Sequence, residues 1–271
     1  ISITQNLLIY LWNMIIPFYK YQGTGNDFVL IDNRELIFPK DHHHLIEKMC
    51  SRKFGIGADG LILLENSDTE DFKMVYFNSD GNLGTMCGNG GRCIVHFANF
   101  LNIINNKTNF EAIDGHHKAS IVNEMISLKM NDVSKIDLRT DYLYLDTGSP
   151  HHVEMVNDLE NFKVTEKGSF LRNHLYGLEG SNINFVEQVN DNSFEVRTYE
   201  RGVEAETLSC GTGVTAVAIA MFELKKTLFN HIQLKTKGGN LSVEFEKNNL
   251  IYQDIYLKGP AELIYKGDWE C

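Results

Sequence analysis

Two stretches of the chain share one pattern: Phe77-Asn-Ser-Asp-Gly-Asn-Leu-Gly-Thr-Met-Cys87-Gly-Asn-Gly-Gly-Arg-Cys93 and Tyr199-Glu-Arg-Gly-Val-Glu-Ala-Glu-Thr-Leu-Ser-Cys210-Gly-Thr-Gly213. In each, a strand-like segment and a polar loop lead to a cysteine followed by Gly-x-Gly. A long apolar run then follows, and such a run is typical of an enclosed helix. The pattern therefore predicts that Cys87 and Cys210 lie at the N-termini of two buried helices.

The start of a helix suits these cysteines for chemistry. Its first N–H groups are unpaired and carry a partial positive charge, so they can bind a carboxylate and lower the pKa of a thiol toward neutrality. The glycines that follow each cysteine let a ligand approach the backbone. Because the arrangement occurs twice, we expect the two thiols to work as a pair.

The order of strands, Cys-Gly-x-Gly helix and further strands also occurs twice. It predicts an α/β (α+β) fold of two pseudo-symmetric halves, each curling β-structure around a central helix, with a ligand site in the cleft between them. Asn26-Asp-Phe-Val and Asn184-Phe-Val, or Asn182 just before it, add a fainter echo.

The remaining pattern predicts short strands and few helices. We expect a surface helix over 41–53, enclosed helices over 94–104 and 214–224, and a loop between the strands at 152–156 and 182–187. Gly55-Ile-Gly57-Ala-Asp-Gly60 matches G-x-G-x-x-G. A strand-like run follows it instead of a helix, so we reject a dinucleotide site. Predicted strands lie near 18–21, 28–31, 61–64, 73–77, 109–113, 118–122, 125–129, 142–146, 194–199, 231–235, 241–246, 250–257 and 262–265.

Composition restricts the class of protein. The 271 residues carry a formal net charge of −11 and no basic stripe, which argues against nucleic acid or an anionic membrane as partner. The five cysteines form no compact disulfide framework, and a cytoplasmic location is expected. Residues 7–16 are apolar but too few to span a bilayer. We expect residues 1–13 to be an extension outside the fold.

The paired cysteines exclude several simpler interpretations. Two buried structural thiols would not explain the shared Cys-Gly-x-Gly. Zinc is disfavoured because Cys87 and Cys93 are six residues apart, and no Cys-x-x-Cys redox motif occurs. A papain-like pair with His151 as base would leave one thiol unexplained. Inversion of a carbon stereocentre, in contrast, needs a base on one face and an acid on the other. No motif indicates a metal or a cofactor, so we predict cofactor-independent racemisation or epimerisation.

These motifs resemble the diaminopimelate epimerase family over residues 15 to 266. The matching stretches are Tyr21-Gln-Gly-Thr-Gly-Asn-Asp-Phe28, Gly55-Ile-Gly-Ala-Asp59, Phe77-Asn-Ser-Asp-Gly81, Cys87-Gly-Asn-Gly-Gly-Arg92, Gly148-Ser-Pro-His151, Asn182-Ile-Asn-Phe185, Tyr199-Glu-Arg-Gly202 and Cys210-Gly-Thr-Gly213. The resemblance implies conversion of LL-2,6-diaminopimelate to the meso isomer in lysine and peptidoglycan-precursor synthesis. It also implies β-barrel-like halves at 14–125 and 126–256, a C-terminal strand within 257–271 that returns to the first half, and a homodimer.

The resemblance further implies roles for individual residues. Cys87 and Cys210 would be the acid/base thiols, with His151 supporting one of them and Glu200 in both a catalytic and a binding role. The reacting carboxylate would be bound by Gly88, Asn89, Gly211 and Thr212. The rest of the substrate would be held by Asn26, Asn78, Asn182, Glu200 and Arg201. Many members have Gln in place of Gly60 and Asn in place of Ser149, so we assign neither position as a contact.

Other functions stay open at this level. A proline-racemase-like enzyme also uses paired thiols, whereas a phenazine-type isomerase would lack them. A non-catalytic binding protein would use the same cleft without exchanging the α-proton. A redox sensor would join the thiols reversibly. The sequence does not assign which thiol deprotonates which isomer.

Overall fold

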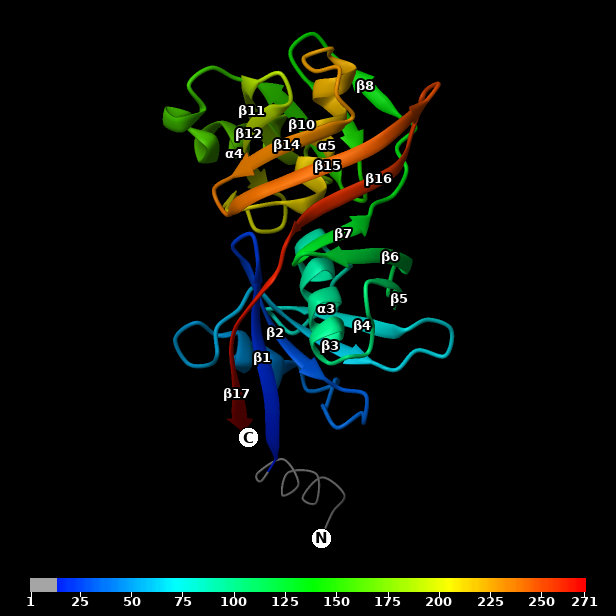
Figure 1. The fold of residues 1–271 in the computed structure, drawn as a ribbon. Helices are drawn as coiled ribbons and strands as arrows, with labels where there is room; N and C mark the ends of the chain where they lie inside the picture. Colours follow the sequence, from blue (N-terminus) through cyan, green and yellow to red (C-terminus); the bar gives the residue numbers. More distant parts are fainter. Residues whose placement is uncertain (1–13) are drawn as a thin grey trace.

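The computed structural model describes residues 14–271 and arranges them as two halves, one below the other in Figure 1. Helix α3 (Gly88–Phe100) lies in the lower half and helix α5 (Gly211–Glu223) in the upper half, each with strands around it. The predicted extension at residues 1–13 falls outside the described residues. Both predicted Cys-Gly-x-Gly helices are present, and they begin at Gly88 and Gly211.

The strands of the first half are β1 (Ile15–Gly23), β2 (Asn26–Asp32), β3 (Gly60–Glu65), β4 (Phe72–Asn78), β5 (Lys107–Ala112), β6 (Gly115–Val122), β7 (Met125–Lys129) and the C-terminal β17 (Glu262–Glu270). Those of the second half are β8 (Ile136–Leu138), β9 (Leu143–Asp146), β10 (Pro150–Met155), β11 (Asn182–Asn190), β12 (Ser193–Glu200), β13 (Ala205–Thr207), β14 (His231–Thr236), β15 (Gly239–Asn248) and β16 (Ile251–Pro260). The smaller helices are α2 (His43–Cys50), η1 (Leu159–Asn161) and α4 (Val164–His174).

The two halves repeat one topology. The first half pairs in the order β17–β1–β2–β3–β4–β5–β6–β7. The second half pairs as β8–β9–β10–β11–β12–β14–β15–β16, with β13 added to β12. From β1 to β7 and from β9 to β16 the pairings follow one succession: antiparallel, parallel, antiparallel, parallel, and then antiparallel twice. The predicted fold of two pseudo-symmetric halves is confirmed.

One strand pair joins the halves. β7 pairs antiparallel with β16, with Leu128 opposite Leu257, and the chain then crosses to the first half, where β17 pairs with β1. Figure 1 shows this red segment running from the upper half past the lower one. We propose a division into 14–125 with 257–271, and 126–256; its boundaries fall within β7 and β16, the two strands that join the halves.

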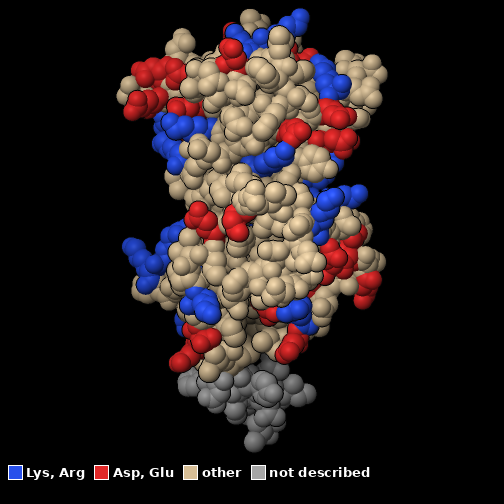
Figure 2. Space-filling model, viewed as in Figure 1, with Lys and Arg blue, Asp and Glu red and all other residues tan. Residues whose placement is uncertain are grey.

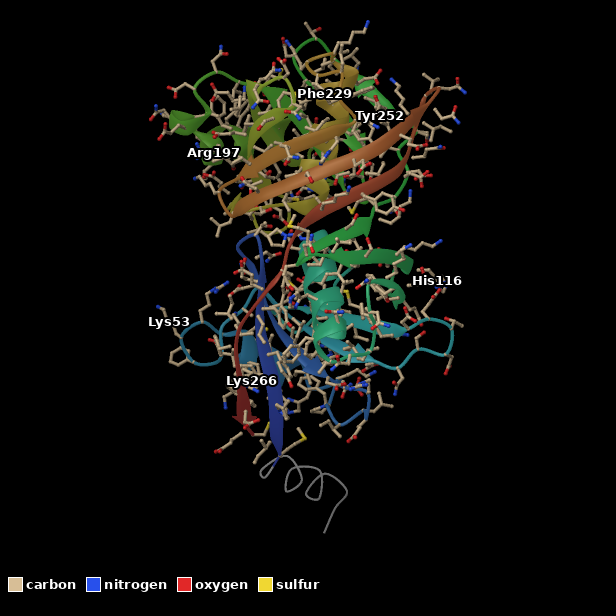
Figure 3. All side chains as sticks on the ribbon, in the orientation of Figure 1. Lys53, His116, Arg197, Phe229, Tyr252 and Lys266 are labelled. Carbon is tan, nitrogen blue, oxygen red and sulfur yellow. The ribbon has the colours of Figure 1, made fainter. Side chains whose placement is uncertain are left out.

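The core follows from the apolar patterns. Every residue of α5 from Val214 to Met221 is buried, because this helix is apolar around its circumference and is enclosed by strands. At its C-terminal end Phe222 packs edge-on against Phe245 and Tyr252, with ring centroids 5.3 and 6.2 Å away. Figure 3, in which Tyr252 is labelled, shows side chains filling the interior of both halves.

The structure corrects three predictions. The helix expected over 41–53 is shorter, His43–Cys50. The loop expected before Asn182 contains α4, which buries only Val164 and Gly168 and so lacks an apolar stripe in the sequence. Helix α4 connects β10 to β11, as α2 connects their counterparts β2 and β3. The asparagine echo is no structural repeat, because Asn26 begins β2 whereas Asn182 begins β11, the counterpart of β3.

The surface carries both signs of charge. Figure 2 shows lysine and arginine interspersed with aspartate and glutamate on the face in view, with no continuous stripe of either sign there. Within residues 14–271, no helix has the length and apolar character needed to cross a membrane.

Candidate active site

The N-termini of α3 and α5 face each other at the centre of the molecule. Cys87 and Cys210 are the N-cap residues of these helices. A Cβ atom built on Gly88 would lie 3.4 Å from the Cα atom of Gly211, and one built on Gly211 would lie 3.2 Å from the Cα atom of Gly88. The two backbones are therefore almost in contact, and a Cβ atom at either position would also lie within 3.0 Å of the Leu257 side chain. The predicted pair of helix starts comes together in one site.

The two sulfur atoms have different partners. The backbone N–H of Gly90 donates to Cys87 Sγ over 3.2 Å, as expected at a helix N-terminus. The sulfur of Cys210 lies 3.5 Å from the hydroxyl oxygen of Thr212, in the first turn of α5. Cys210 is buried, whereas Cys87 is half-buried. The site is thus symmetric in its backbone and asymmetric in its side chains.

The expected lowering of the thiol pKa is wrong for this structure. Burial raises the pKa of Cys87 to about 11 and that of Cys210 to about 12. The Gly90 N–H lowers the pKa of Cys87, and the Thr212 hydroxyl lowers that of Cys210, but both effects are smaller than the cost of removing a thiolate from water. The Glu200 carboxylate raises the pKa of both sulfurs further. Both cysteines are therefore neutral thiols at pH 7.

His151 is connected to Cys210 through Thr212. His151 is fully buried on β10, and its Nε2 atom lies 2.9 Å from Thr212 Oγ1. The Asn184 amide donates to His151 Nδ1 over 3.1 Å, so the ring proton belongs on Nε2 and points toward Thr212. Burial lowers the pKa of His151 to about 3, and the nearby Arg201 charge contributes. The ring is therefore neutral.

Asn184 was absent from the predicted site although it lies within a quoted motif. It is fully buried, and its Oδ1 atom accepts a hydrogen bond of 2.9 Å from Thr198. An asparagine in the middle of a buried strand needs partners for its amide. The sequence could therefore have indicated a polar partner for Asn184, and in the structure His151 is one such partner.

Asn26 and Asn89 meet beside the start of α3. The Asn89 amide donates to Asn26 Oδ1 over 3.3 Å and to the carbonyl of Ser209, in the other half, over 3.1 Å. Asn89 Oδ1 is buried and has no hydrogen-bond partner within residues 14–271. The Asn26 amide donates to Asp59 over 2.6 Å. Asp59, from the rejected Gly55–Gly60 motif, is a residue that the sequence analysis missed as a support for the site.

Asn78 and Glu200 occupy equivalent strand ends, β4 and β12. Asn78 is exposed, and its side chain donates to none of the other candidate residues in the described chain. Glu200 is half-buried, and burial raises the pKa of its carboxyl group. Its charge acts on both thiols, which places it near the two helix starts.

Asn182 and Arg201 lie together on the second half. Asn182 Oδ1 accepts a hydrogen bond of 2.9 Å from the backbone N–H of Arg201, and its amide donates to Ser149 Oγ over 2.8 Å. The guanidinium group of Arg201 is exposed and donates to the carbonyl of Glu179 over 3.0 Å. Ser149 thus supports Asn182 in this structure.

Arg92 is a fully buried cation one helical turn from Gly88. It donates to Gly88 O over 3.2 Å, Thr24 Oγ1 over 2.9 Å and Pro260 O over 3.2 Å. These acceptors are neutral, and no carboxylate pairs with it among the described residues. Burial lowers the pKa of Arg92 to about 10, which leaves it charged at pH 7. Its positive charge lowers the pKa of Cys87.

Neither thiol lines the cavity of about 610 Å³ between the β5–β6 and β15–β16 strands. That cavity is mixed in charge, with Lys107 and Lys118 on one side and Glu244 and Glu246 on the other. Among residues 14–271, no cluster of three or more His, Cys, Asp or Glu side chains is placed to hold a metal. The thiol site is identified by its convergent helix ends instead of by an open pocket.

Comparison with known proteins agrees with this geometry. A family model described as diaminopimelate epimerase matches residues 18–136 and 143–264. The diaminopimelate epimerase of Flavobacterium psychrophilum is 59% identical over 92% of this chain and 98% of its own length. That of Chlorobaculum tepidum is 43% identical over 90% of this chain and 98% of its own.

Solved structures share the fold at low identity. A phenazine biosynthesis protein of the PhzF family from Bacillus anthracis superposes with a TM-score of 0.76 at 14% identity, covering 94% of this chain and 99% of that one. A hydroxyproline epimerase from Agrobacterium vitis, with bound trans-4-hydroxy-L-proline, gives a TM-score of 0.70 at 12% identity over 95% and 93% of the two chains. At such identities the likeness concerns the fold alone.

Proposed function

The chain belongs to the diaminopimelate epimerase family, and we propose that it inverts the α-carbon of LL-2,6-diaminopimelate with Cys87 and Cys210 acting from opposite faces. It is an isomerase that epimerises diaminopimelate, and its role in lysine biosynthesis follows from the family. We further propose that the meso product also supplies peptidoglycan precursors. The observation that carries the mechanism is the close approach of Gly88 and Gly211, which brings the two cysteine-capped helix ends to one site.

The helix ends give the reacting carboxylate a binding place. Backbone N–H groups in the first turns of α3 and α5, from Gly88, Asn89, Gly211 and Thr212, are oriented toward the site by helix geometry. Negative charge that moves onto the carboxylate as the α-proton leaves is stabilised by these groups and by the two helix dipoles. This contribution needs no metal and no cofactor, so we propose cofactor-independent catalysis.

One thiol first gives its proton to solvent as the substrate binds, so that the proton transfers use one thiolate and one thiol. The thiolate takes the α-proton and becomes a thiol, the electron pair stays on the α-carbon and its carboxylate, and the opposite thiol delivers its proton and becomes a thiolate. The substrate ammonium group brings the positive charge that favours thiolate formation in a site where burial opposes it. Thr212 donates its hydroxyl hydrogen to the Cys210 sulfur, and His151 holds Thr212 in place.

The remaining candidates suit the rest of the substrate. Glu200 can pair with an ammonium group, and Arg201 can bind the distal carboxylate through its forked N–H groups once it leaves the carbonyl of Glu179. Asn26, Asn78 and Asn182 offer amides that bind either charge. We propose these five residues as the substrate-binding set. Assembly as a homodimer and a cytoplasmic location remain predictions.

The test is proton exchange measured in deuterated water. We expect the protein to incorporate deuterium at the α-carbon of LL-diaminopimelate as it forms the meso isomer, and to leave proline unchanged. Cys87→Ala and Cys210→Ala should each reduce epimerisation about 100- to 10,000-fold, the range of one acid–base group. Cys93→Ala, which removes a buried thiol further along α3, is the matched control and should keep most of the activity.

The outcomes separate the alternatives. Activity on proline alone would replace the substrate proposed here. Binding of diaminopimelate without deuterium incorporation would indicate a non-catalytic binding protein. Full epimerisation by either cysteine variant would contradict the two-base mechanism. A reversible Cys87–Cys210 disulfide should inactivate the enzyme, and full activity of the oxidised protein would argue against paired catalytic thiols.

A further inference from the structure

The pseudo-symmetry of the fold makes Gly60 the counterpart of Asn182. Gly60 begins β3 and pairs in parallel with Phe28 of β2, whereas Asn182 begins β11 and pairs in parallel with His151 of β10, the counterpart of β2. Asn182 contributes an amide to the candidate site, where it meets Arg201. Gly60 has no side chain, so the first half lacks a polar group from the equivalent position.

The phenol ring of Tyr76 fills the space beside Gly60. A Cβ atom built on Gly60 would lie 2.5 Å from Tyr76 Cε2 and 3.0 Å from the Tyr76 hydroxyl oxygen. A Cβ atom built on Gly84 would lie 2.6 Å from Cδ1 and Cε1 of the same ring. The edge of Phe28 meets the ring with the centroids 6.0 Å apart. The ring of Tyr76 therefore fits between Gly60 and Gly84 only because neither residue has a side chain.

The Tyr76 hydroxyl oxygen lies next to Gly60, at the position where the counterpart residue Asn182 carries its amide in the other half. Burial raises the pKa of Tyr76, and the charges of Cys87, Asp59 and Glu200 raise it further. The Cβ position of Gly84, which touches the other side of the ring, is 3.1 Å from Asn78 Oδ1, so the ring lies near a proposed substrate-binding residue. Tyr76 is half-buried, and no hydrogen bond to its hydroxyl is formed within residues 14–271. The protonated hydroxyl is thus a donor that is available to a ligand.

From this placement we propose that Tyr76 is a substrate-binding residue whose hydroxyl donates a hydrogen bond to the distal carboxylate of bound diaminopimelate. The inference rests on the proposed function. The amides at the starts of α3 and α5 already serve the reacting carboxylate, and Glu200 suits an ammonium group. The distal carboxylate, which Arg201 would bind from the second half, has further oxygen lone pairs that can accept a hydrogen bond from a hydroxyl of the first half. Tyr76 then supplies, from β4, the polar contact that Asn182 supplies in the other half.

The test compares Tyr76→Phe with Tyr19→Phe in steady-state epimerisation of LL-diaminopimelate. Tyr19 is a matched control because it is also half-buried against α3 but packs on Phe97 and Phe100, at the far end of that helix. A hydrogen bond to a charged group predicts that KM rises about 10- to 100-fold in Tyr76→Phe. kcat should change less than about threefold, because a contact at the distal end acts equally on the ground state and the transition state.

Three results would overturn the inference. They are an unchanged KM in Tyr76→Phe, a loss confined to kcat, and an equal rise in KM in Tyr19→Phe. Wild-type turnover of LL-diaminopimelate is measured in the same experiment. If the wild type turns over the substrate and Tyr76→Phe matches it, only the role of Tyr76 fails. If the wild type itself does not epimerise diaminopimelate, the proposed function fails first.

Discussion

His151 Nε2 lies 2.9 Å from the hydroxyl oxygen of Thr212, and that oxygen is 3.5 Å from the sulfur of Cys210. The position equivalent to Thr212 in α3 is Asn89, whose amide is directed to Asn26 and Ser209 instead of to Cys87. The two thiols of this pseudo-symmetric site are therefore chemically unequal. Cys210 has a hydroxyl donor held by a neutral imidazole, whereas Cys87 has the N–H of Gly90.

The first prediction concerns this hydroxyl. Thr212→Val should lower kcat/KM about 10-fold, because the Cys210 thiolate loses a hydrogen bond in a buried site. The loss should be equal from the LL and meso sides, because the equilibrium constant does not depend on the enzyme. Thr212→Ser keeps the hydroxyl and should retain activity. Thr215→Val is the matched control, since the Thr215 hydroxyl bonds to Gly211 O within the helix. Unchanged kinetics in Thr212→Val would remove the hydroxyl from the mechanism.

The second prediction concerns the stability of the fold in acid. Burial lowers the pKa of His151 to about 3, while an unfolded histidine titrates near 6.5. Between these values the unfolded chain binds one more proton at this residue, so the free energy of unfolding falls as the pH falls. The contribution of this group approaches about 1.4 kcal/mol per pH unit. It is fully present above about pH 6.5 and is lost progressively toward pH 3.

Urea unfolding of the wild type and His151→Gln at several values between about pH 4.5 and pH 7 measures this term. Glutamine does not titrate, so the curve of unfolding free energy against pH should be shallower in the variant. Subtracting the two curves cancels the titration of the carboxyl groups. Parallel curves would mean that the pKa of His151 is the same in the folded and the unfolded protein.

The sequence was sufficient to predict the duplicated architecture and the two helix starts capped by Cys87 and Cys210. Those features depend on local rules, namely an apolar run that must be enclosed and a cysteine at a helix start. The strand order from β1 to β7, repeated from β9 to β16, was not predicted; it shows one supersecondary unit used twice. Helix α4 was missed because its burial is confined to Val164 and Gly168, although the duplication and the position of α2 would have predicted it.

The thiol pKa values could not be predicted from the sequence. The N–H groups of a helix start are visible there, but the burial that outweighs them depends on how two helices from different halves close against each other. The residues that hold the site side chains in place could not be predicted for the same reason. Asp59 reaches Asn26 and Arg92 reaches Pro260 only through long-range packing.

The third prediction concerns Arg92, which ties three segments together through Gly88, Thr24 and Pro260. Arg92→Met should lower the free energy of unfolding by about 2–4 kcal/mol, because buried acceptors lose their donors. Arg139→Met, at an exposed position, should change it by less than about 0.5 kcal/mol.

A second measurement isolates the charge of Arg92. In a Cys210→Ala background, Arg92→Met should slow the alkylation of Cys87 by iodoacetamide at a fixed alkaline pH, because the pKa of Cys87 rises when the nearby cation is removed. A variant that loses stability but keeps the wild-type profile of alkylation against pH would limit Arg92 to a structural role.

The fourth prediction tests how Asn26 is held. Asp59 accepts the Asn26 amide at 2.6 Å and is paired with Arg52, also at 2.6 Å, so the carboxylate fixes the direction of the asparagine side chain. In Asp59→Ala the Asn26 side chain keeps only its contact with Asn89, so its direction is less fixed and part of the binding energy is then spent on ordering it. We expect KM for diaminopimelate to rise about 5- to 20-fold, as for the loss of one hydrogen bond.

Asp32→Ala, which removes a surface partner of Arg34, is the control and should leave KM unchanged. Because Asp59 contacts Asn26, we expect kcat to stay unchanged. A fall in kcat without a change in KM would show that Asp59 acts on the thiols instead.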